Sequence, residues 1–377
     1  MSAWFTPWVL AALAAAPEGQ IAYVSGTEQQ DQRVCVLDLA TGEGRPVGVG
    51  ASDGAPAWSP DGARIAYHSK ADPGLVIRVV NADGSGDMAL PHQYGWNHHP
   101  QWSTDGCGRA VCKNKICGRY LLYTAEEGSG LDSRIMVYDT QSQTESPWAG
   151  GREGMMRPVW LPTLDLTRAK HLEEITWEGV DTPALMQELE SVGGVLAVGV
   201  AQAETLLSTE VLLATASQAV PLLRLLTEES ERYVEWAITP DRDAHRIAFE
   251  SNDGGNREIF VLHKKGLTNV TNHRAADWNP VWGPSGEWLA FESFREGRQG
   301  VYRVFPDTAL VLKVDASPDY SAWHPVWSPD SQWILYVSTG SGDPELYVTE
   351  VQTGDRRRLT NHVGIDDAPA WRPEVRQ

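Results

Sequence analysis

The 377-residue chain is 42% hydrophobic and 21% charged, which excludes a disordered polymer and allows a large packed core. Its 50 acidic and 31 basic residues give a formal charge of −19, so its field repels nucleic acid phosphates and anionic lipid headgroups. We therefore expect a soluble protein that binds no nucleic acid and has neutral or cationic partners, although an acidic surplus also serves solubility alone.

The N-terminal segment, residues 1–16, carries no charged side chain and ends in three alanines. This pattern predicts an export signal that is cleaved after a small residue, leaving a mature domain at 17–377. A packed or disordered arm is the alternative, because the usual basic start is missing. The apolar run is too short to cross a bilayer. We expect a periplasmic or secreted protein that does not span a membrane.

Cysteines gather in one short segment, at Cys107, Cys112 and Cys117. Their spacing suits an excursion over residues 106–118 that is held by a disulfide in an oxidising compartment, with the pairing left open. Zinc binding is the alternative, but structural zinc sites usually combine two closely spaced pairs or include His. Cys35, inside an apolar run, is expected to be a buried free thiol.

A Trp-containing unit repeats along the chain: a Pro-x-Trp segment, a turn rich in Pro, Asp and Gly, and an apolar strand that ends near Ser. The anchor residues of the seven copies are Trp58, Trp102, Trp160, Trp236, Trp282, Trp327 and Trp371. They are separated by 44, 58, 76, 46, 45 and 44 residues. Repeats of about 40–50 residues with several short strands are typical of propeller blades.

Each unit is predicted to supply four strands. The turn, as in Ser59-Pro60-Asp61-Gly62, opens a hairpin. A third strand follows, such as Glu345–Val351, and then a short fourth strand, such as Arg358–Thr360. We predict an all-β fold, a single propeller of four-stranded blades. Seven blades are favoured, with six as the alternative if the segment after Trp160 forms no sheet.

The two chain ends are predicted to close the ring together. Trp371 has no strands after it, whereas Ile21–Ser25 and Arg33–Leu37 have no anchor before them. Sharing one blade would remove open sheet edges, which are otherwise sites of aggregation.

The third unit is longer than the others, and residues 161–195 are expected to form a partly helical insertion. Thr182 would be its N-cap, with Pro183 in the first turn and Gly193 after the end. The apolar face of this helix would cover a blade edge or, as a less favoured alternative, dock a partner.

The turn at 56–62 and the Ile-Ala-Tyr-x-Ser strand at 65–69 resemble the PD40 repeat of TolB-like propellers and of propeller domains attached to prolyl-oligopeptidase-type enzymes. The resemblance runs from Gln20 to Glu374 and weakens between about 161 and 232. WD40 repeats match less well, because their Gly-His and Trp-Asp pairs are absent. The resemblance implies the fold and leaves the ligand open. TolB carries an extra α/β domain ahead of its propeller, for which there is no room before Ile21.

The functional reading favours binding over catalysis. A prolyl-oligopeptidase-type enzyme needs a separate α/β domain with a Gly-x-Ser-x-Gly elbow, which the sequence lacks. We expect a non-catalytic, monomeric binding protein of the cell envelope that takes a protein, peptide or small molecule on its loops and channel mouth. The alternatives are a lactonase- or phytase-like metal-dependent hydrolase and a structural scaffold without a ligand.

No cofactor is expected, with calcium at the channel mouth as the open alternative. The segments Asp241-Arg242-Asp243 and Asn252–Asn256 look like calcium loops but lack the full ligand spacing, and turns explain them better.

The predicted ligand site lies at the mouth of the central channel. The anchor strand is expected to be innermost in each blade, so the residues just before each anchor converge on one end of the channel. They are Asp53, Asn97, His98, His99, Asp277, Trp278, Asn279, Trp323, His324, Asp366 and Asp367. The carboxylates would attract a cationic group, and the indoles would stack on it or on a sugar ring. His98 and His99 would change the affinity between about pH 5 and 8.

Overall fold

A computed structural model of the protein describes residues 16–374. It omits 29, 105–117, 128–131, 152, 162–180, 182, 186, 189–193, 204–205, 215–218, 222–234, 242–244, 253–254 and 264–265. The expected export signal, apart from Ala16, and the three clustered cysteines therefore lie outside the described residues. Within the described part, no helix is long and apolar enough to cross a membrane.

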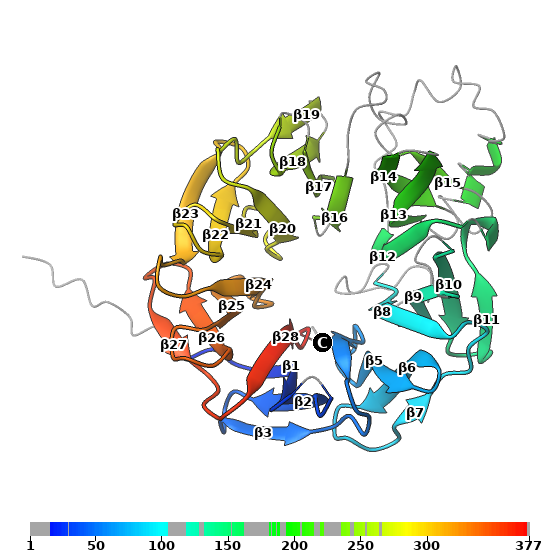
Figure 1. Ribbon diagram of the computed structural model, residues 1–377, viewed down its shortest axis with the longest axis horizontal. Coiled ribbons are helices and arrows are strands. Elements are labelled where there is room, and N and C mark those ends of the chain that lie inside the picture. Colours follow the sequence, from blue (N-terminus) through cyan, green and yellow to red (C-terminus); the bar gives the residue numbers. More distant parts are fainter. Residues whose placement is uncertain are drawn as a thin grey trace, which may run out of the picture.

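Strands are arranged around a ring, with one strand of each four-stranded unit nearest the axis (Figure 1). The inner strands are β28 (Ile365–Trp371), β4 (Gly54–Trp58), β8 (Trp96–Trp102), β12 (Met155–Leu161), β16 (Glu235–Pro240), β20 (Asp277–Trp282) and β24 (Ala322–Trp327). Each inner strand contacts the next around the ring, and β24 contacts β28 again. The ring is therefore closed through its inner strands.

Three further strands follow outward from each inner strand. The second strands are β1 (Gln20–Gly26), β5 (Arg64–Ala71), β9 (Tyr120–Glu126), β13 (Gly194–Ala203), β17 (Ile247–Ser251), β21 (Leu289–Ser293) and β25 (Trp333–Ser338). The third strands are β2 (Arg33–Asp38), β6 (Gly74–Asn81), β10 (Arg134–Asp139), β14 (Leu206–Ala214), β18 (Glu258–His263), β22 (Gly300–Phe305) and β26 (Glu345–Glu350). The outer strands are β3 (Glu43–Pro46), β7 (Met88–Ala89), β11 (Thr144–Pro147), β15 (Ala219–Pro221), β19 (Gly266–Asn269), β23 (Leu310–Asp315) and β27 (Arg356–Arg358). A short 3-10 helix, η1 (Ala149–Gly151), follows β11.

These strands form five four-stranded sheets and one eight-stranded sheet, in which a single parallel pair, Leu75 with Trp96, joins two antiparallel units. The described strands thus divide into four-stranded units, numbered blades 1–7 below from the unit β28-β1-β2-β3 to the unit β24-β25-β26-β27. The segment after Trp160 does form a sheet, since β12 pairs with β13. The number of blades in the molecule stays a prediction, which an experimental density map tests.

The predicted closure by both chain ends is confirmed. The C-terminal strand β28 pairs antiparallel with β1, with Trp371 opposite Ile21 and Asp366 opposite Ser25. Strand β1 pairs in turn with β2, and β2 with β3. The innermost strand of blade 1 therefore comes from one end of the chain and its other three strands from the other end.

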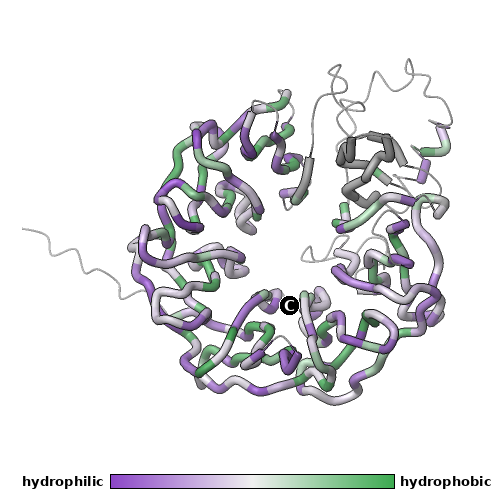
Figure 2. The backbone as a smooth tube through the Cα atoms, in the orientation of Figure 1, coloured by the Kyte–Doolittle hydropathy of each residue, from purple (hydrophilic) through white to green (hydrophobic). Residues whose placement is uncertain are grey.

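The apolar core lies between neighbouring blades and not at the ring axis. One cluster packs Ile21 and Trp371 of blade 1 against Leu335 and Val348 of blade 7. Hydrophobic stretches accordingly recur along the coloured parts of the blades (Figure 2). Because these described clusters bury apolar side chains from two neighbouring blades, the blades concerned depend on one another for their core.

Four anchor Trp residues, Trp58, Trp102, Trp282 and Trp327, bind their blade to the one before it through an indole hydrogen bond. The indole Nε1 of Trp102 donates to the carbonyl oxygen of Ala57 at 3.0 Å, and that of Trp327 to Val281 at 3.1 Å. In both cases the acceptor is the residue immediately before the anchor Trp of the preceding blade. The Arg64 guanidinium also lies 4.7 Å from the centroid of the Trp102 ring, in a cation–π contact. The repeated Trp residues thus join neighbouring blades.

Blade 5 corrects the predicted anchor at Trp236. The indole of Trp282 in blade 6 donates to the carbonyl of Thr239 at 3.1 Å, which places Pro240 and not Trp236 at the anchor position of blade 5. The register shift between Trp236 and Thr239 agrees, because the matching shift in β20 lies between Trp278 and Val281. Trp236 therefore stands at the strand position of Trp278.

The predicted insertion is described only in part. Residues 183–185 and 187–188 are helical, and Leu185 is buried. The Asp181 carboxylate accepts the backbone N–H of Ala184 at 3.1 Å, as an N-cap does, and the predicted cap Thr182 lies outside the described residues. The predicted C-terminal stop at Gly193 lies outside the described residues.

Candidate binding face at the start of the inner strands

Every inner strand carries a β-bulge at the same place. The residue at the bulge has a positive φ: Ala55, His99, Arg157, Ala237, Asn279, His324 and Ala368, with φ between 45° and 53°. Where burial is described, the residue two positions earlier is buried, and on the bulged strands β8, β20, β24 and β28 the bulge residue and the one before it are at least partly exposed. The end of the ring at which the inner strands begin is called the mouth face below.

Four predicted site residues are therefore placed differently from expectation. Asp53, Asn97, Asp277 and Asp366 occupy the position two before the bulge and are at most 2% exposed. Asn97 donates from its amide to the carbonyls of Leu75 and Tyr94. These side chains belong to the interfaces between blades and are not exposed at the mouth face, because the strand pleat points them toward a face of their sheet, which a neighbouring blade covers.

The other predicted site residues are at least partly exposed, as the sequence analysis expects. They are His98, His99, Trp278, Asn279, Trp323, His324 and Asp367. The structure brings three of them together at the junction of blades 7 and 1. Oδ1 of Asp367 accepts the indole N–H of Trp323 at 3.1 Å and lies 2.6 Å from Nδ1 of His324.

Charge is balanced within this group of three. Burial alone would lower the pKa of His324, but its hydrogen bond to Asp367 raises that pKa above the usual value. Burial alone would raise the pKa of Asp367, but the hydrogen bond from His324 holds it below the usual value. The pair is therefore ionised over the pH range between the two pKa values. It presents both a cation and an anion to a partner.

Two buried carboxylates beneath the mouth face were missed by sequence reasoning. Glu292 accepts the amide of Asn279 at 2.7 Å and the backbone N–H of His324 at 3.0 Å. Glu250 accepts the backbone N–H of Asn279 at 3.4 Å, and burial raises its pKa. Each sits in a Phe-Glu-Ser segment at the end of an apolar strand, Phe249–Ser251 and Phe291–Ser293. A charged residue inside a buried run is the signal that could have found them.

The expected pH response of His99 is wrong. Burial and the neighbouring His98 lower the pKa of His99 to about 3, so this ring is neutral throughout the range between pH 5 and 8. Burial also lowers the pKa of the nearby His68 to about 4. His98 lies 2.9 Å from the Glu126 carboxylate through its Nε2. The hydrogen bond to Asp367 instead raises the pKa of His324, so this ring keeps its charge to higher pH than an ordinary histidine.

Exposed apolar side chains gather at the mouth face. Among the described residues, six large apolar side chains are strongly exposed. Four lie in segments that lead into an inner strand or follow the adjacent end of a second strand: Val49 (60%), Trp96 (45%), Phe294 (49%) and Val363 (81%). The other two, Met88 and Leu310, lie at or near the opposite ends of their blades.

Comparison with known proteins agrees with this architecture. No family model matches the chain. It is 31% identical over 137 residues to the protein TolB homolog of Chlorobium chlorochromatii (strain CaD3), covering 35% of this chain and 30% of that protein. It is 33% identical over 66 residues to the Tol-Pal system protein TolB of Desulfosudis oleivorans, covering 17% of this chain and 15% of that protein.

Solved structures cover most of the chain. TolB from Acinetobacter baumannii matches 97% of this chain and 69% of its own, with a TM-score of 0.55 and 15% identity. The β-propeller domain of the trilobed protease from Pyrococcus furiosus matches 92% of this chain and 97% of its own, with a TM-score of 0.62 and 12% identity. The chain is a TolB-like β-propeller.

Turn chemistry explains the described parts of the two calcium-like segments in this TolB-like propeller. Oδ1 of Asp241 accepts the backbone N–H groups of His245 at 2.7 Å and Arg246 at 3.2 Å, as a turn-forming Asp does. The Asn256 amide donates to the carbonyl of His273 at 2.9 Å. Asp243 and residues 253–254 lie outside the described residues.

A pocket lies at the face of the TolB-like propeller that is opposite the mouth face. This pocket of about 470 Å³ is lined by Trp288, Arg303 and Gln332, among others, at the outer ends of blades 6 and 7. Arg303 stacks 4.6 Å from the Trp288 ring and donates to the carbonyl of Val351. The main cation of this pocket, Arg303, is already engaged. The mouth face therefore offers the richer set of exposed groups.

Proposed function

We propose that this TolB-like propeller is a non-catalytic interaction protein of the cell envelope, periplasmic or secreted, that binds a protein or peptide partner on its mouth face. The observation that carries the proposal is that four of the six strongly exposed large apolar side chains of the described residues, Val49, Trp96, Phe294 and Val363, lie on that face. Apolar surface that is exposed mainly on one face marks an interaction site. The Trp323, His324 and Asp367 group adds directional polar contacts beside them.

The relatives support an envelope role, since one of them bears the name Tol-Pal system protein TolB. The chain spans only 15% and 30% of the two curated relatives, so the partner is inferred from the face itself. Exposed indole and phenyl rings favour a partner with apolar or cationic side chains. The formal charge of −19 favours the cationic ones.

The test compares two double variants in capture from an extract of the native envelope. Trp96→Ala with Phe294→Ala removes two exposed rings from the mouth face. Met88→Ala with Leu310→Ala is the matched control, because it removes two exposed apolar side chains from elsewhere on the ring. We expect the partner bound by the wild type to be retained by the control and lost, by about tenfold or more in affinity, from the mouth-face variant.

Folding is checked on the same samples by thermal melting, which both variants should pass because all four side chains are exposed. Equal capture by the two folded variants would contradict the mouth face as the binding surface. If the mouth-face double variant retains the partner and His324→Ala loses it, the binding site lies instead at the polar group between blades 7 and 1.

A further inference from the structure

Two blade junctions share one set of hydrogen bonds. At the junction of blades 5 and 6, the backbone N–H of Asp277 donates to the carbonyl of Arg257 at 2.8 Å, and that of His273 to Glu258 at 2.9 Å. At the junction of blades 7 and 1, the N–H of Asp366 donates to Pro344 at 3.0 Å, and that of His362 to Glu345 at 3.0 Å. Glu258, His273 and Asp277 thus correspond to Glu345, His362 and Asp366.

Thr271 and Thr360 extend the correspondence. The hydroxyl of Thr271 accepts the backbone N–H of Ile259 at 3.0 Å, and the hydroxyl of Thr360 accepts that of Leu346 at 2.9 Å. The two junctions therefore form equivalent buried sockets, each with one Glu, one Thr, one His and one Asp. We call them the 5/6 socket and the 7/1 socket.

In the 5/6 socket, protein groups satisfy both carboxylates. Asp277 is fully buried, and the guanidinium of Arg295 reaches its Oδ2 at 2.7 Å. Glu258 accepts the Thr271 hydroxyl at 2.6 Å through Oε2 and the Asn256 amide at 3.0 Å through Oε1. An internal cation therefore balances the buried Asp.

The 7/1 socket has no residue that takes the place of Arg295. Ser293 pairs with Asp277 and Ser25 pairs with Asp366, so the residue that corresponds to Arg295 is Thr27. Within the described part of the chain, both carboxylate oxygens of Asp366 and Oε2 of Glu345 have no hydrogen-bond partner, although both side chains are fully buried. Arg358 pairs only with Oε1 of Glu345, at 2.7 Å. Two buried anions thus face one another with a cationic partner on one side only.

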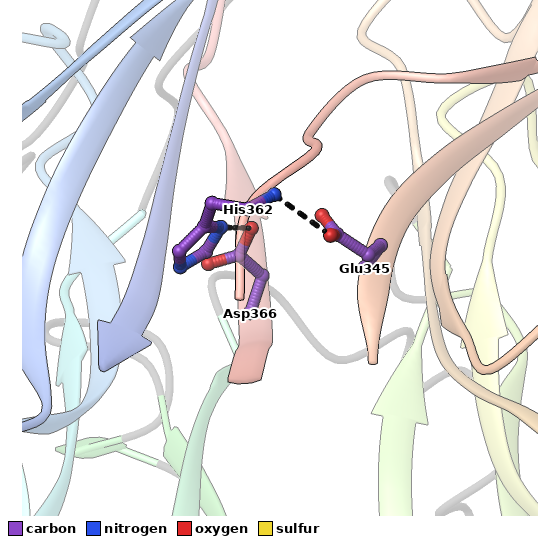
Figure 3. A group of neighbouring side chains, drawn as sticks. All are labelled: Glu345, His362 and Asp366. Atoms are coloured by element: carbon purple, nitrogen blue, oxygen red, sulfur yellow. Dashed lines mark hydrogen bonds and ion pairs between the residues drawn. The ribbon is translucent and has the colours of Figure 1, made fainter. Parts of the chain in front are cut away.

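The histidines of the two sockets are turned differently. In the 5/6 socket, Nδ1 of His273 accepts the backbone N–H of Ala275 at 3.0 Å. In the 7/1 socket, Nδ1 of His362 faces Oδ2 of Asp366 at 3.3 Å (Figure 3). Nε2 of the same ring lies 3.1 Å from the hydroxyl of Ser25. Glu345, His362 and Asp366 each offer one possible ligand atom, and these three atoms lie within 4.8 Å of one another.

We propose that Glu345, His362 and Asp366 bind a divalent transition-metal ion of the zinc type, which ties the C-terminal strand to blade 7. One imidazole nitrogen with two carboxylates suits zinc, whereas calcium and magnesium prefer oxygen ligands alone. Two tetrahedral zinc ligands at their usual bond lengths lie about 3.3 Å apart, which matches the spacing of the imidazole and Asp366. The Ser25 hydroxyl orients the ring through its other nitrogen, as outer groups do at metal sites.

The surroundings of the site agree with a bound cation. His362 is 41% exposed, which leaves an open side for a water ligand. Glu345 lies on β26, whereas His362 and Asp366 lie on the segment that leads into β28 and on β28 itself. The ion would join the two chain segments that close the ring.

The test measures thermal unfolding of the full chain after removal of metal with EDTA, and then with added zinc chloride. At free zinc about a hundredfold above its Kd, we expect the melting temperature of the wild type to rise by about 3–6 °C. Asp366→Asn and Glu345→Gln should each lose at least tenfold in zinc affinity by titration calorimetry. The three clustered cysteines are present in every variant, so any zinc they bind cancels in the comparison.

The matched control is Asp277→Asn in the 5/6 socket. It should lower the melting temperature in EDTA yet keep the zinc-dependent rise. The proposal is overturned if zinc does not raise the melting temperature of the wild type, or if it raises that of Asp366→Asn by as much. A rise with calcium and none with zinc would equally overturn the assignment to a transition metal.

Discussion

The 5/6 and 7/1 sockets have the same backbone and differ in how their charge is balanced. In the first, Arg295 neutralises the buried Asp277, whereas in the second Thr27 replaces the arginine and Asp366 keeps two unpartnered oxygens. The repeat therefore determines the backbone of both sockets. A single residue just beyond the second strand decides whether the buried charge is balanced. The difference falls where the two chain ends meet, and the predictions below test it from the largest expected effect to the smallest.

The closing strand itself should have the largest effect. Deleting residues 366–377 removes Trp371, which is buried against blade 7, and leaves β1 without its inner partner. We expect the loss of cooperative unfolding or a fall in stability of several kcal/mol, because core burial is lost in two blades. Thermal melting followed by circular dichroism measures this. An unchanged melting temperature would refute closure through the chain ends.

Removing the cation of the 5/6 socket should have the next largest effect. Arg295→Leu leaves Asp277 fully buried with its charge uncompensated, which costs about 3–5 kcal/mol. Urea unfolding measures the change. Arg298→Leu, at an exposed arginine three residues further along, is the matched control and should change stability by less than about 0.5 kcal/mol. Similar values for the two variants would show that the sockets do not differ in the way described.

The 7/1 socket should respond in the opposite sense when metal is absent. Burial raises the folded-state pKa of Asp366, so its ionised form costs stability at neutral pH and this cost disappears as the pH falls through the folded pKa. In EDTA at pH 7.5, Asp366→Asn should therefore be as stable as the wild type or more stable, by up to about 3 kcal/mol. The difference should shrink as the pH falls toward the folded-state pKa of Asp366.

Urea unfolding of the two proteins across this pH range isolates the contribution of Asp366 from that of the other titrating groups. The buried His68 and His99 act in the other direction, because their lowered pKa values make both proteins lose stability as the pH falls below about 6.5. A variant that is clearly less stable than the wild type at pH 7.5 in EDTA would mean that the Asp366 carboxylate is already satisfied.

Transferring the arginine should have the smallest effect on stability. Thr27→Arg places a guanidinium at the position that Arg295 has in the 5/6 socket. We expect a gain of about 1 kcal/mol or less in EDTA, since ordering the long side chain offsets part of the ion pair. The zinc-dependent rise in melting temperature should be lost. Thr41→Arg, at an exposed threonine on the β2–β3 turn, controls for added charge and should keep the zinc response.

The strand order and the closure of the ring were within reach of the sequence. The Pro-x-Trp repeat, its turns and the unmatched strands at the two ends specify which segments pair, because turn residues and period-2 alternation are local signals. Apart from Asp53, which immediately precedes β4, the predicted site residues do lie on inner strands. The burial of these residues was not predicted, since Asp53 and Asp277 were expected at the channel mouth and are buried between blades.

Local sequence determined the repeat, the turns and the position of each strand in its blade. Tertiary structure decided the rest, for two physical reasons. The bulge at residues such as Asn279 and His324 breaks the alternation of side chains, so two successive residues face the same side and the buried positions cannot be counted from the anchor. The balance of buried charge depends on groups from two blades, such as Asp277 with Arg295 or Glu345 with Asp366, and only packing of the blades brings them together.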